Sequence, residues 1–406
     1  MLISLAWRNI WRQPVRSVLS VLGMALTSML LVFMLSFQLG SYDMMKTGSL
    51  RLFDGFGQFQ PIGYPEDPDI SRRIENADAI ITALRDIPEI TAITARATGF
   101  VILANGDLSF GAAVVGIDPD SEGNISTLSS TIKEGRYLKP DDTGTIVLGD
   151  GLARNLKLEV GDGVVLLGSG TDGSVAADVL TLVGVFSSGV PELDRQIAQM
   201  PLARFQETFA LSGDVNTIAL AGDTLADVVH IDAELREIAA KNGVLYRNWE
   251  QLQPAIKQMI QLDMGTSGMM YITLVIVVVF IILNTLYMSV LERTREFGGL
   301  LALGMRPRKI GKMVWLELVF LSFLGAGLGI VLGTALTLYF ANTGIYIPGM
   351  DDIYAQWGIP SRLFPTLTPF SVLVGPGVIV GAIAILGFIP YRHILGLEPV
   401  TAMASP

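Results

Sequence analysis

The 406-residue sequence contains no cysteine, only two histidines and few charged residues. The absence of cysteine excludes thiol catalysis, cysteine metal sites and disulfides, so every domain must rely on its apolar core for stability. His230 and His393 have no metal-ligating partner at the usual spacing, and we assign both to surface roles. The sequence therefore offers no candidate for the chemistry that cysteine and histidine commonly supply.

The sequence also lacks a phosphate-binding loop. The nearest string runs from Gly304 to Gly311 and Lys312, with six residues between its glycines where the loop requires four. Met313 stands where a serine or threonine would hold Mg²⁺. If ATP drives this protein, another chain binds the nucleotide and its magnesium, and we expect no cofactor in this one.

Paired carboxylates are numerous, for example Asp118 with Asp120 and Asp141 with Asp142, but 38 acidic residues produce such pairs by chance. The stretch from Asp118 to Glu122 lacks the glycine and the terminal glutamate of an EF-hand loop. We therefore expect no metal site, and no residue set points to an enzyme.

Charged residues make up 16% of the chain, well below the roughly 25% of soluble domains. Four runs without Asp, Glu, Lys or Arg exceed the roughly 20 residues that cross a hydrocarbon core. They lie at 17–42, 264–291, 318–350 and 363–391. The first is too long for the apolar part of a cleaved signal peptide. The sequence therefore predicts a membrane protein with four transmembrane α-helices.

The distribution of charge fixes the expected orientation. Residues 43–263 hold 32 of the 38 acidic residues but only 17 of the 28 basic ones, whereas most other basic residues flank the ends of the spans. By the positive-inside rule, the arginine-rich segments face the cytoplasm and the acidic segment faces outward. A large extracytoplasmic domain is therefore predicted between the first two spans.

Apolar alternation and helical periodicity both occur in the outer segment, which predicts a two-lobed α+β domain. A β-rich lobe at about 131–190, rich in glycine and short strands, is inserted in a mixed α/β lobe with helices at 75–85, 202–210 and 225–240. The predicted segments are an interfacial amphipathic helix at 1–16, transmembrane helices at 17–42, 264–291, 314–341 and 369–391, the outer domain at 43–263, a cytoplasmic helix and loop at 292–313, an outer loop at 342–368 and a cytoplasmic tail at 392–406.

Glu317 is the acidic residue of the third predicted span and lies near its inner end. We expect this carboxylate at the interface, beside Arg306 or Lys312. Carriers driven by an ion gradient hold their coupling ion on charged groups deep within the spans, and this sequence places none there. An ion-coupled carrier is therefore disfavoured.

The segment 290–310, between the second and third spans, has the pattern of a short, compact helix. Gly304 can end it in a left-handed cap, and Pro307 can open the helix that leads into the third span. A positively charged loop would explain the arginines but not this pattern. We expect one apolar side on this helix, made by Phe297, Leu301 and Leu303, beside charged groups. The residues that characterise the helix are Glu292, Arg293, Arg295, Glu296, Phe297, Leu301, Leu303 and Gly304.

Four strings resemble the FtsX-like permeases, the superfamily that includes the macrolide-exporter permease and the lipoprotein-releasing permeases. They lie at 5–12 (LAWRNIWR), 116–119 (GIDP), 292–305 (from ERTREFG to ALGM) and 397–403 (LEPVTAM). The order of one span, a large outer domain and three spans is also similar. The resemblance thus extends over nearly the whole chain.

This resemblance implies a permease subunit of an ABC transporter in the bacterial inner membrane, with a periplasmic core domain. The helix near 292–304 would be the coupling helix that docks into a separate ATPase, which binds ATP and magnesium. The family works as a homo- or heterodimer and passes the motion of the ATPases through spans one and two to the periplasm. The implied cargo is hydrophobic or amphiphilic, such as a lipoprotein, a lipid or a hydrophobic compound.

Further partners follow from the same resemblance. They are a second permease copy or paralogue, a periplasmic or outer-membrane partner and membrane lipid, but no nucleic acid. In the lipoprotein-releasing member that recruits a periplasmic carrier, a long hairpin protrudes from the β lobe, whereas residues 168–178 here are short, polar and glycine-rich. Handover to such a carrier is thus not implied for this chain, although a partner permease could supply it. The rival function is a signalling subunit that transports nothing and activates a periplasmic partner such as a cell-wall hydrolase.

Methionines gather where the first two spans leave the membrane on the outer side. Methionine suits a surface that must fit variable acyl chains, because its unbranched side chain repacks at little cost. Ordinary packing is the alternative explanation. The candidate cargo contacts are Met34, Phe37, Met44, Met45, Met264, Met269, Met270 and Tyr271.

Small residues recur at a spacing of four in spans three and four. Such spacing permits close approach between helices, although glycine is also generally enriched in membrane helices. The candidate packing residues are Gly325, Gly329, Gly333, Gly377 and Gly381.

Overall fold

A computed structural model describes residues 2–12, 14–351, 354 and 361–396 of the chain. The described residues form two compact units: those within 1–42, 260–346 and 362–396 form a helical unit, and those within 43–259 and 347–361 form a sheet unit. The string at 397–403 and most of the predicted cytoplasmic tail lie outside the described residues.

Four helices among the described residues are long and apolar enough to cross a membrane. They are α2 (Pro14–Ser49), α11 (Pro254–Glu292), α13 (Pro307–Thr343) and α15 (Pro369–Leu386). The π-helix η1 (Leu50–Asp54) continues α2, and α16 (Phe388–Leu395) follows α15. The 36 residues of α2 span about 54 Å at 1.5 Å per residue. A hydrocarbon core is about 30 Å thick, so α2 is considerably longer than a membrane crossing requires.

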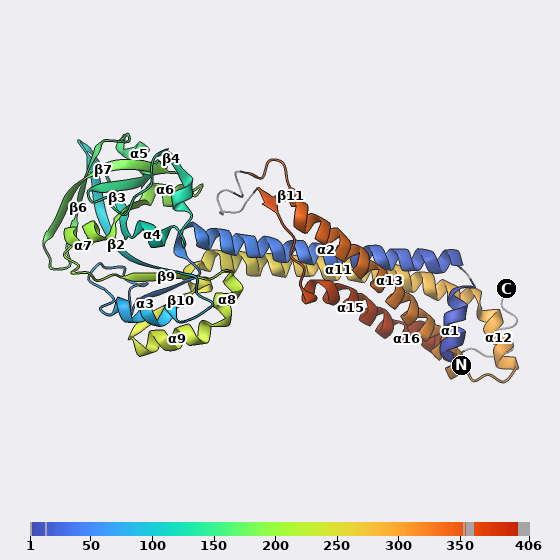
Figure 1. The fold of residues 1–406 in the computed structure, drawn as a ribbon. Helices are drawn as coiled ribbons and strands as arrows, with labels where there is room; N and C mark the ends of the chain where they lie inside the picture. Colours follow the sequence, from blue (N-terminus) through green and yellow to red (C-terminus); the bar gives the residue numbers. More distant parts are fainter. Residues whose placement is uncertain (1, 13, 352–353, 355–360, 397–406) are drawn as a thin grey trace. The chain divides into compact units, whose positions relative to one another are not determined.

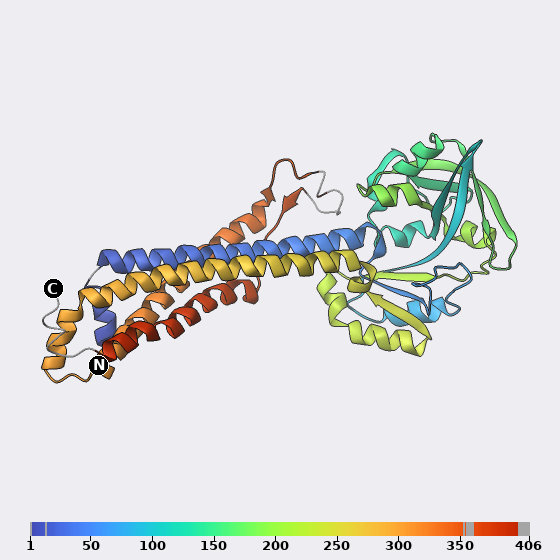
Figure 2. The same cartoon turned by 180° about the vertical axis from the view of Figure 1, so that it is seen from behind.

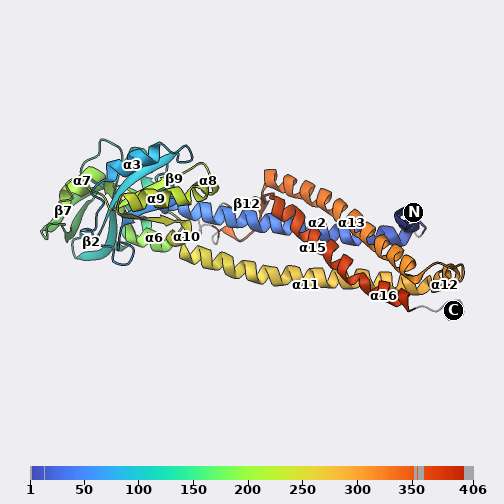
Figure 3. The same ribbon diagram turned by 90° about the horizontal axis from the view of Figure 1, so that it is seen from below.

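The helical unit packs around α13. Helices α1 (Leu2–Ile10), α15 and α16 contact α13, and α1 lies at the same end of the unit as α12 (Thr294–Ala302) (Figures 1 and 3). Strands β11 (Ile345–Tyr346) and β12 (Arg362–Leu363) pair between α13 and α15. Buried side chains from α1 and from all four long helices form one core, which comprises Ile10, Met24, Leu31, Val279, Ile282, Leu318, Leu321, Ile379 and Ile383.

The sheet unit contains a ten-stranded sheet within the described residues. Its strands are β1 (Gly57–Pro61), β2 (Ala92–Asn105), β3 (Leu108–Ile117), β4 (Ile132–Gly135), β5 (Thr145–Gly149), β6 (Gly163–Ser169), β7 (Val175–Phe186), β8 (Ile197–Pro201), β9 (Thr217–Ala221) and β10 (Val244–Asn248). The order is β10-β1-β9-β2-β3-β8-β5-β7-β4, with β6 bridging β2 and β7. The pairs β3–β8 and β5–β7 are parallel, and the other pairs are antiparallel.

Short helices cover this sheet. They are α3 (Ala77–Arg85), α4 (Pro119–Glu122), η2 (Leu128–Thr131), α5 (Asp150–Leu156), α6 (Pro191–Gln196), α7 (Leu202–Thr208), α8 (Leu225–His230), α9 (Asp232–Lys241) and α10 (Trp249–Leu252). Figure 1 shows α3, α8 and α9 beside β9 and β10, and Figure 2 shows the same group from behind. One core joins α3, α8 and α9 to β1, β9 and β10, and a second joins α5 and α7 to the β2, β3 and β5–β8 strands.

Two local features differ from the sequence prediction. Helix α5 lies within the glycine-rich stretch at 131–190, because Leu152, Ala153 and Leu156 bury one helical face in the second core. The helix expected at 225–240 is interrupted at Ile231, and Asp232 begins a new helix. Burial of Ile231 against the first core selects this break, which local periodicity alone does not reveal.

Candidate functional site

Helix α12 has sharply defined ends. Arg293 separates it from α11, and Gly304 follows it with a φ of +89°. The amides of Gly304 and Met305 donate to the carbonyls of Leu301 and Leu300, at 2.9 and 3.0 Å. These two bonds form a Schellman motif, which requires the left-handed conformation that glycine adopts at little cost. The glycine stop that the sequence predicts is therefore present.

The two sides of α12 have different environments. Phe297 is 1% exposed and packs in a cluster with Ala6 of α1 and with Ile310 and Val314 of α13. Leu303 is 86% exposed, which corrects the expectation that it shares the apolar side with Phe297. The reason is that Leu303 follows the last residue of the helix, where the chain turns away from the bundle. An arginine, Arg295, is also exposed, and it makes no ion pair or hydrogen bond within the described part of the chain.

The other charged residues predicted for this helix contact the bundle. Glu292 pairs with Arg16 at 2.8 Å, and Glu296 lies 3.6 Å from Arg12 and 3.5 Å from Arg293. Glu317 pairs with Arg293 at 3.4 Å, not with Arg306 or Lys312 as expected. The α11–α12 junction places Arg293 over this carboxylate, although the two residues are 24 positions apart.

An apolar cavity of about 350 Å³ lies between α2, α11 and α15. It is lined by Leu31, Leu35, Gln38, Met264, Gly268, Tyr271, Ile272, Val275, Ile276, Phe370, Val374, Gly375 and Val378. Of the predicted cargo contacts, Met264 and Tyr271 line it. The contribution of α15 was not foreseen, because nothing local to spans one and two indicates which later helix packs beside them.

The remaining predicted contacts lie elsewhere. Met34, Met269 and Met270 are 40%, 73% and 50% exposed and do not line the cavity. Phe37 stacks against Phe33. Met44 and Met45 belong to the sheet unit, where Met45 is 8% exposed. The structure therefore does not gather the eight residues into one surface.

A polar cluster joins α2 to α11 at one end of the cavity. Gln38 donates its side-chain amide to Tyr42 at 2.6 Å and to Asp263 at 3.0 Å, and Tyr42 donates to Asp263 at 2.5 Å. Tyr271 donates to the side-chain oxygen of Gln38 at 2.9 Å. Gln38 and Tyr271 thus place hydrogen-bonding groups at the edge of an apolar space.

Three of the five predicted packing glycines lie between α13 and α2. A Cβ atom on Gly325, Gly329 or Gly333 would lie 2.5, 2.4 or 2.8 Å from the Cβ of Met24, Ser28 or Val32. Gly377 and Gly381 would meet nothing within 4 Å among the described residues. The sequence spacing thus marks one tight helix contact on α13 and an open face on α15.

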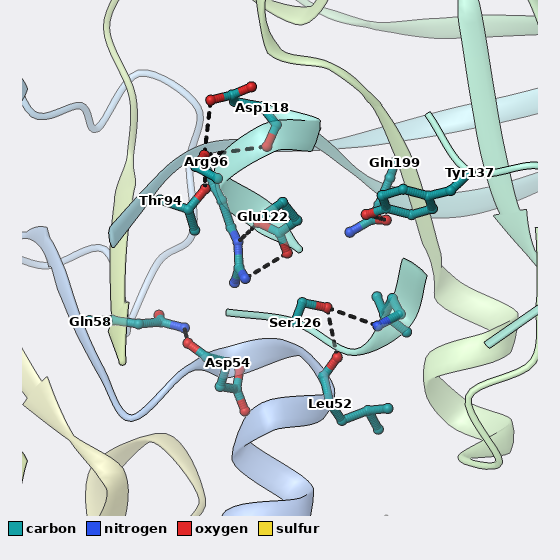
Figure 4. A network of polar contacts seen from close by, with 12 residues as sticks. Leu52, Asp54, Gln58, Thr94, Arg96, Asp118, Glu122, Ser126, Tyr137 and Gln199 are labelled. Carbon is teal, nitrogen blue, oxygen red and sulfur yellow. Dashed lines mark hydrogen bonds and ion pairs between the residues drawn. The ribbon is translucent and has the colours of Figure 1, made fainter. Parts of the chain in front are cut away.

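A buried ion pair in the sheet unit was not anticipated. Arg96 of β2 donates to both carboxylate oxygens of Glu122, at 2.8 and 2.7 Å, and both side chains are at most 2% exposed (Figure 4). The guanidinium lies 4.4 Å from the ring centre of Phe53 in η1. The one sequence signal was a lone arginine inside an apolar strand. Glu122 belongs to the stretch considered above for calcium binding, and both of its carboxylate oxygens accept hydrogen bonds from Arg96.

Hydrogen bonds extend this network to the end of α2. Ser126 donates to the carbonyl of Leu52 at 2.9 Å, and Tyr137 donates to Gln199 at 2.7 Å (Figure 4). Burial raises the pKa of the Tyr137 hydroxyl, and the charge of Glu122 raises it further. Tyr137 therefore stays protonated and continues to donate. The π-helix η1, which continues α2, is thus held in the sheet unit by the hydrogen bond to Leu52 and by the contact of Phe53 with Arg96.

Family models match most of the chain. The MacB-like periplasmic core domain matches residues 17–238, and the FtsX-like permease C-terminal domain matches residues 268–399. The lipoprotein-releasing system transmembrane protein LolC of Neisseria meningitidis serogroup B is 23% identical over 95% of this chain and 93% of that protein. An uncharacterized ABC transporter permease of Methanocaldococcus jannaschii is 24% identical over 99% of this chain and 97% of its own.

The macrolide export ATP-binding/permease protein MacB of Campylobacter jejuni is 23% identical over 99% of this chain but only 61% of its own length. The two matched domains cover more than half of the sequence and fall on the four long apolar helices and the sheet unit. The chain is therefore a multi-pass membrane protein that belongs to the FtsX-like family of ABC transporter permease subunits and carries a MacB-like periplasmic core domain.

Proposed function

We propose that this chain is a permease whose motion is driven by ATP hydrolysis in a separate subunit and which extracts or exports a hydrophobic or amphiphilic cargo across or from the bacterial inner membrane. The observation that carries the proposal is that α12 and the residue that follows it combine a buried anchor with exposed side chains. Phe297 fixes the helix to the bundle, while Arg295 and Leu303 are exposed and uncommitted within the described residues. An exposed arginine and an exposed leucine are both suited to a protein contact.

Continuity of the helices supports the transmission of motion to the periplasm. Helix α2 begins in the helical unit and continues into the sheet unit without interruption. Helix α11 begins in the sheet unit and continues into the helical unit in the same way. We take the sheet unit to be two lobes, because its apolar residues form separate cores around β9–β10 and around β5–β8. We also propose that a second permease copy or paralogue completes the transporter.

The apolar cavity favours cargo transport over signalling alone. Its volume of about 350 Å³ and its edge of Gln38 and Tyr271 suit an acyl chain or similar apolar group with a polar end. A subunit that only relays a signal needs no such space between its spans. The lipid or lipopeptide would enter from the membrane, where α2, α11 and α15 border the cavity.

Contact with the ATPase is tested by changing the exposed side of α12. We expect Arg295→Glu together with Leu303→Asp to weaken co-purification of the ATPase by about 30-fold, the effect of losing a strong interface contact. Arg308→Glu makes the charge change of Arg295→Glu at an exposed position beyond the helix and serves as the control. Full co-purification of the double variant would show that α12 does not dock the ATPase.

Cargo contact is tested by a photocrosslinking residue at Met264. It should capture lipid, lipopeptide or lipoprotein without nucleotide and lose that product when ATP is added. A crosslinker at Met269, on the same helix but outside the cavity and 73% exposed, reports general contact with bulk lipid. Equal labelling at both positions, insensitive to ATP, would assign the cavity to packing and place the cargo elsewhere.

A further inference from the structure

Three arginines and three glutamates meet at the end of the helical unit where α1 and α12 lie. They surround a polar cavity of about 130 Å³, which is large enough for ordered water. Its lining comes from five segments of the chain and comprises Asn9, Arg12, Arg16, Ser17, Ser20, Ser289, Arg293, Glu296, Glu317 and Leu321. Glu292 joins the group through its ion pair with Arg16.

The centre of this cluster is the pair Arg293–Glu317. Their side chains are 13% and 14% exposed, and Asn9 of α1 donates to the same carboxylate at 3.3 Å. Removing one partner of a largely buried ion pair is costly because the other charge is left unpaired, so this pair holds the α11–α12 junction against α13. Asn9 adds α1 to the same point.

The rim of the cluster connects two chain junctions. Arg12 lies in the turn after α1, and Arg16 lies in the first turn of α2. Their partners are Glu296 in α12 and Glu292 at the end of α11. Arg16 also donates to the carbonyl of Thr285. Beneath the charges, Ala6 of α1 is fully buried in the cluster that contains Phe297.

We infer that Arg12 and Arg16 are positioning residues that pass the displacement of α12 to α2, so that one coupling helix moves both stalk helices α2 and α11. This inference rests on the proposed function, because it requires that an ATPase displaces α12. Helix α11 is connected to α12 covalently through Arg293. Helix α2 is joined to this junction by the pair of Arg16 with Glu292 at the end of α11, and Arg12, just before α2, pairs with Glu296 of α12. Glu292 and Glu296 therefore belong to the internal connection, and Arg295 and Leu303 to the docking surface.

Two simpler explanations predict different outcomes from this inference. If the arginines only set topology, any basic residue in the cytoplasmic N-terminal segment would be equivalent. If they only stabilised the fold, exposed pairs would contribute little, since Arg12 and Glu296 are 65% and 51% exposed. A role in transmission instead requires the matched partner across the junction.

The experiment uses the full chain with the ATPase that co-purifies with it. Because the sequence lacks cysteine, Met34→Cys on α2, a position that is 40% exposed, provides a unique site for a spin label on this helix. The label spectrum is recorded without nucleotide and with ATP and vanadate, in the background variant, Arg16→Glu, Glu292→Arg, the double variant and Arg8→Glu. Arg8 is exposed on α1 and lies outside the cluster, so it controls for loss of cytoplasmic positive charge.

We expect Arg16→Glu and Glu292→Arg each to retain the ATPase while reducing the nucleotide-dependent spectral change by about fivefold, a typical lower value for coupling between sites. The double variant should restore the change, and Arg8→Glu should leave it intact. An unaltered spectral change in Arg16→Glu, no restoration in the double variant, or loss of the ATPase from the single variants would overturn the inference. The proposed function is judged separately, by whether Arg295→Glu with Leu303→Asp releases the ATPase.

Discussion

Replacing Gly329 by alanine should separate α2 from α13 and destabilise the helical unit by about 1–3 kcal/mol, the usual cost of overpacking. The added Cβ would lie 2.4 Å from the Cβ of Ser28 and 2.6 Å from the carbonyl oxygen of Ala25. Backbone atoms cannot yield as the end of a flexible side chain does, so the helices must move apart. The loss is measured as a lower midpoint of thermal unfolding of the full chain in detergent.

Gly327→Ala is the matched control, because it adds the same methyl group two residues away on the same helix. Its Cβ would meet nothing within 4 Å among the described residues, and alanine also favours the helical backbone. We expect it to leave the midpoint unchanged or to raise it slightly. Equal midpoints for the two variants would contradict the packing of α2 on this side of α13.

Replacing Arg96 by methionine should have the largest effect in the sheet unit, a loss of about 3–5 kcal/mol. The change leaves Glu122 buried at 1% exposure without its partner, and an unpaired buried charge carries its full desolvation cost. Unfolding in denaturant measures the loss. Faster amide exchange in β2 and η1 should accompany it, since Phe53 loses the guanidinium that it contacts.

Two further variants test the cause. Arg96→Met with Glu122→Leu removes both charges and should regain most of the stability, because apolar replacements of buried pairs are often neutral. Lys241→Ala breaks the exposed pair with Glu237 and should leave the stability nearly unchanged. A single variant at Arg96 with unchanged stability would show that the pair does not hold the fold together.

The spans could be predicted because their signal is local. A run without charged residues must be helical in lipid, and the four runs correspond to four long apolar helices among the described residues. The stop at Gly304 is equally local, since it depends on glycine tolerating a positive φ. Resemblance in short strings was sufficient to identify the family.

The partners of charged residues could not be predicted because they are separated along the chain. Arg293 and Glu317 are 24 residues apart, Arg96 and Glu122 are 26 apart, and Arg16 and Glu292 are 276 apart. Which carboxylate lies near which arginine depends on helix packing and strand register, and neither leaves a periodic mark in the sequence. The cavity beside Met264 likewise needs α15, which follows about 100 residues later.

The ties between α2 and α11 limit how the apolar cavity can enlarge. The pair of Arg16 and Glu292 joins the two helices at one end. At the other end, Gln38 and Tyr42 of α2 donate hydrogen bonds to Asp263 of α11. Two rods that are pinned together near both ends cannot slide past each other, but they can bow apart between the pins. Long helices bend gently at little cost, whereas shearing would break both sets of contacts. Widening of the cavity should therefore appear as curvature of α2 and α11, greatest near Leu31 and Val275, with the pinned ends keeping their register.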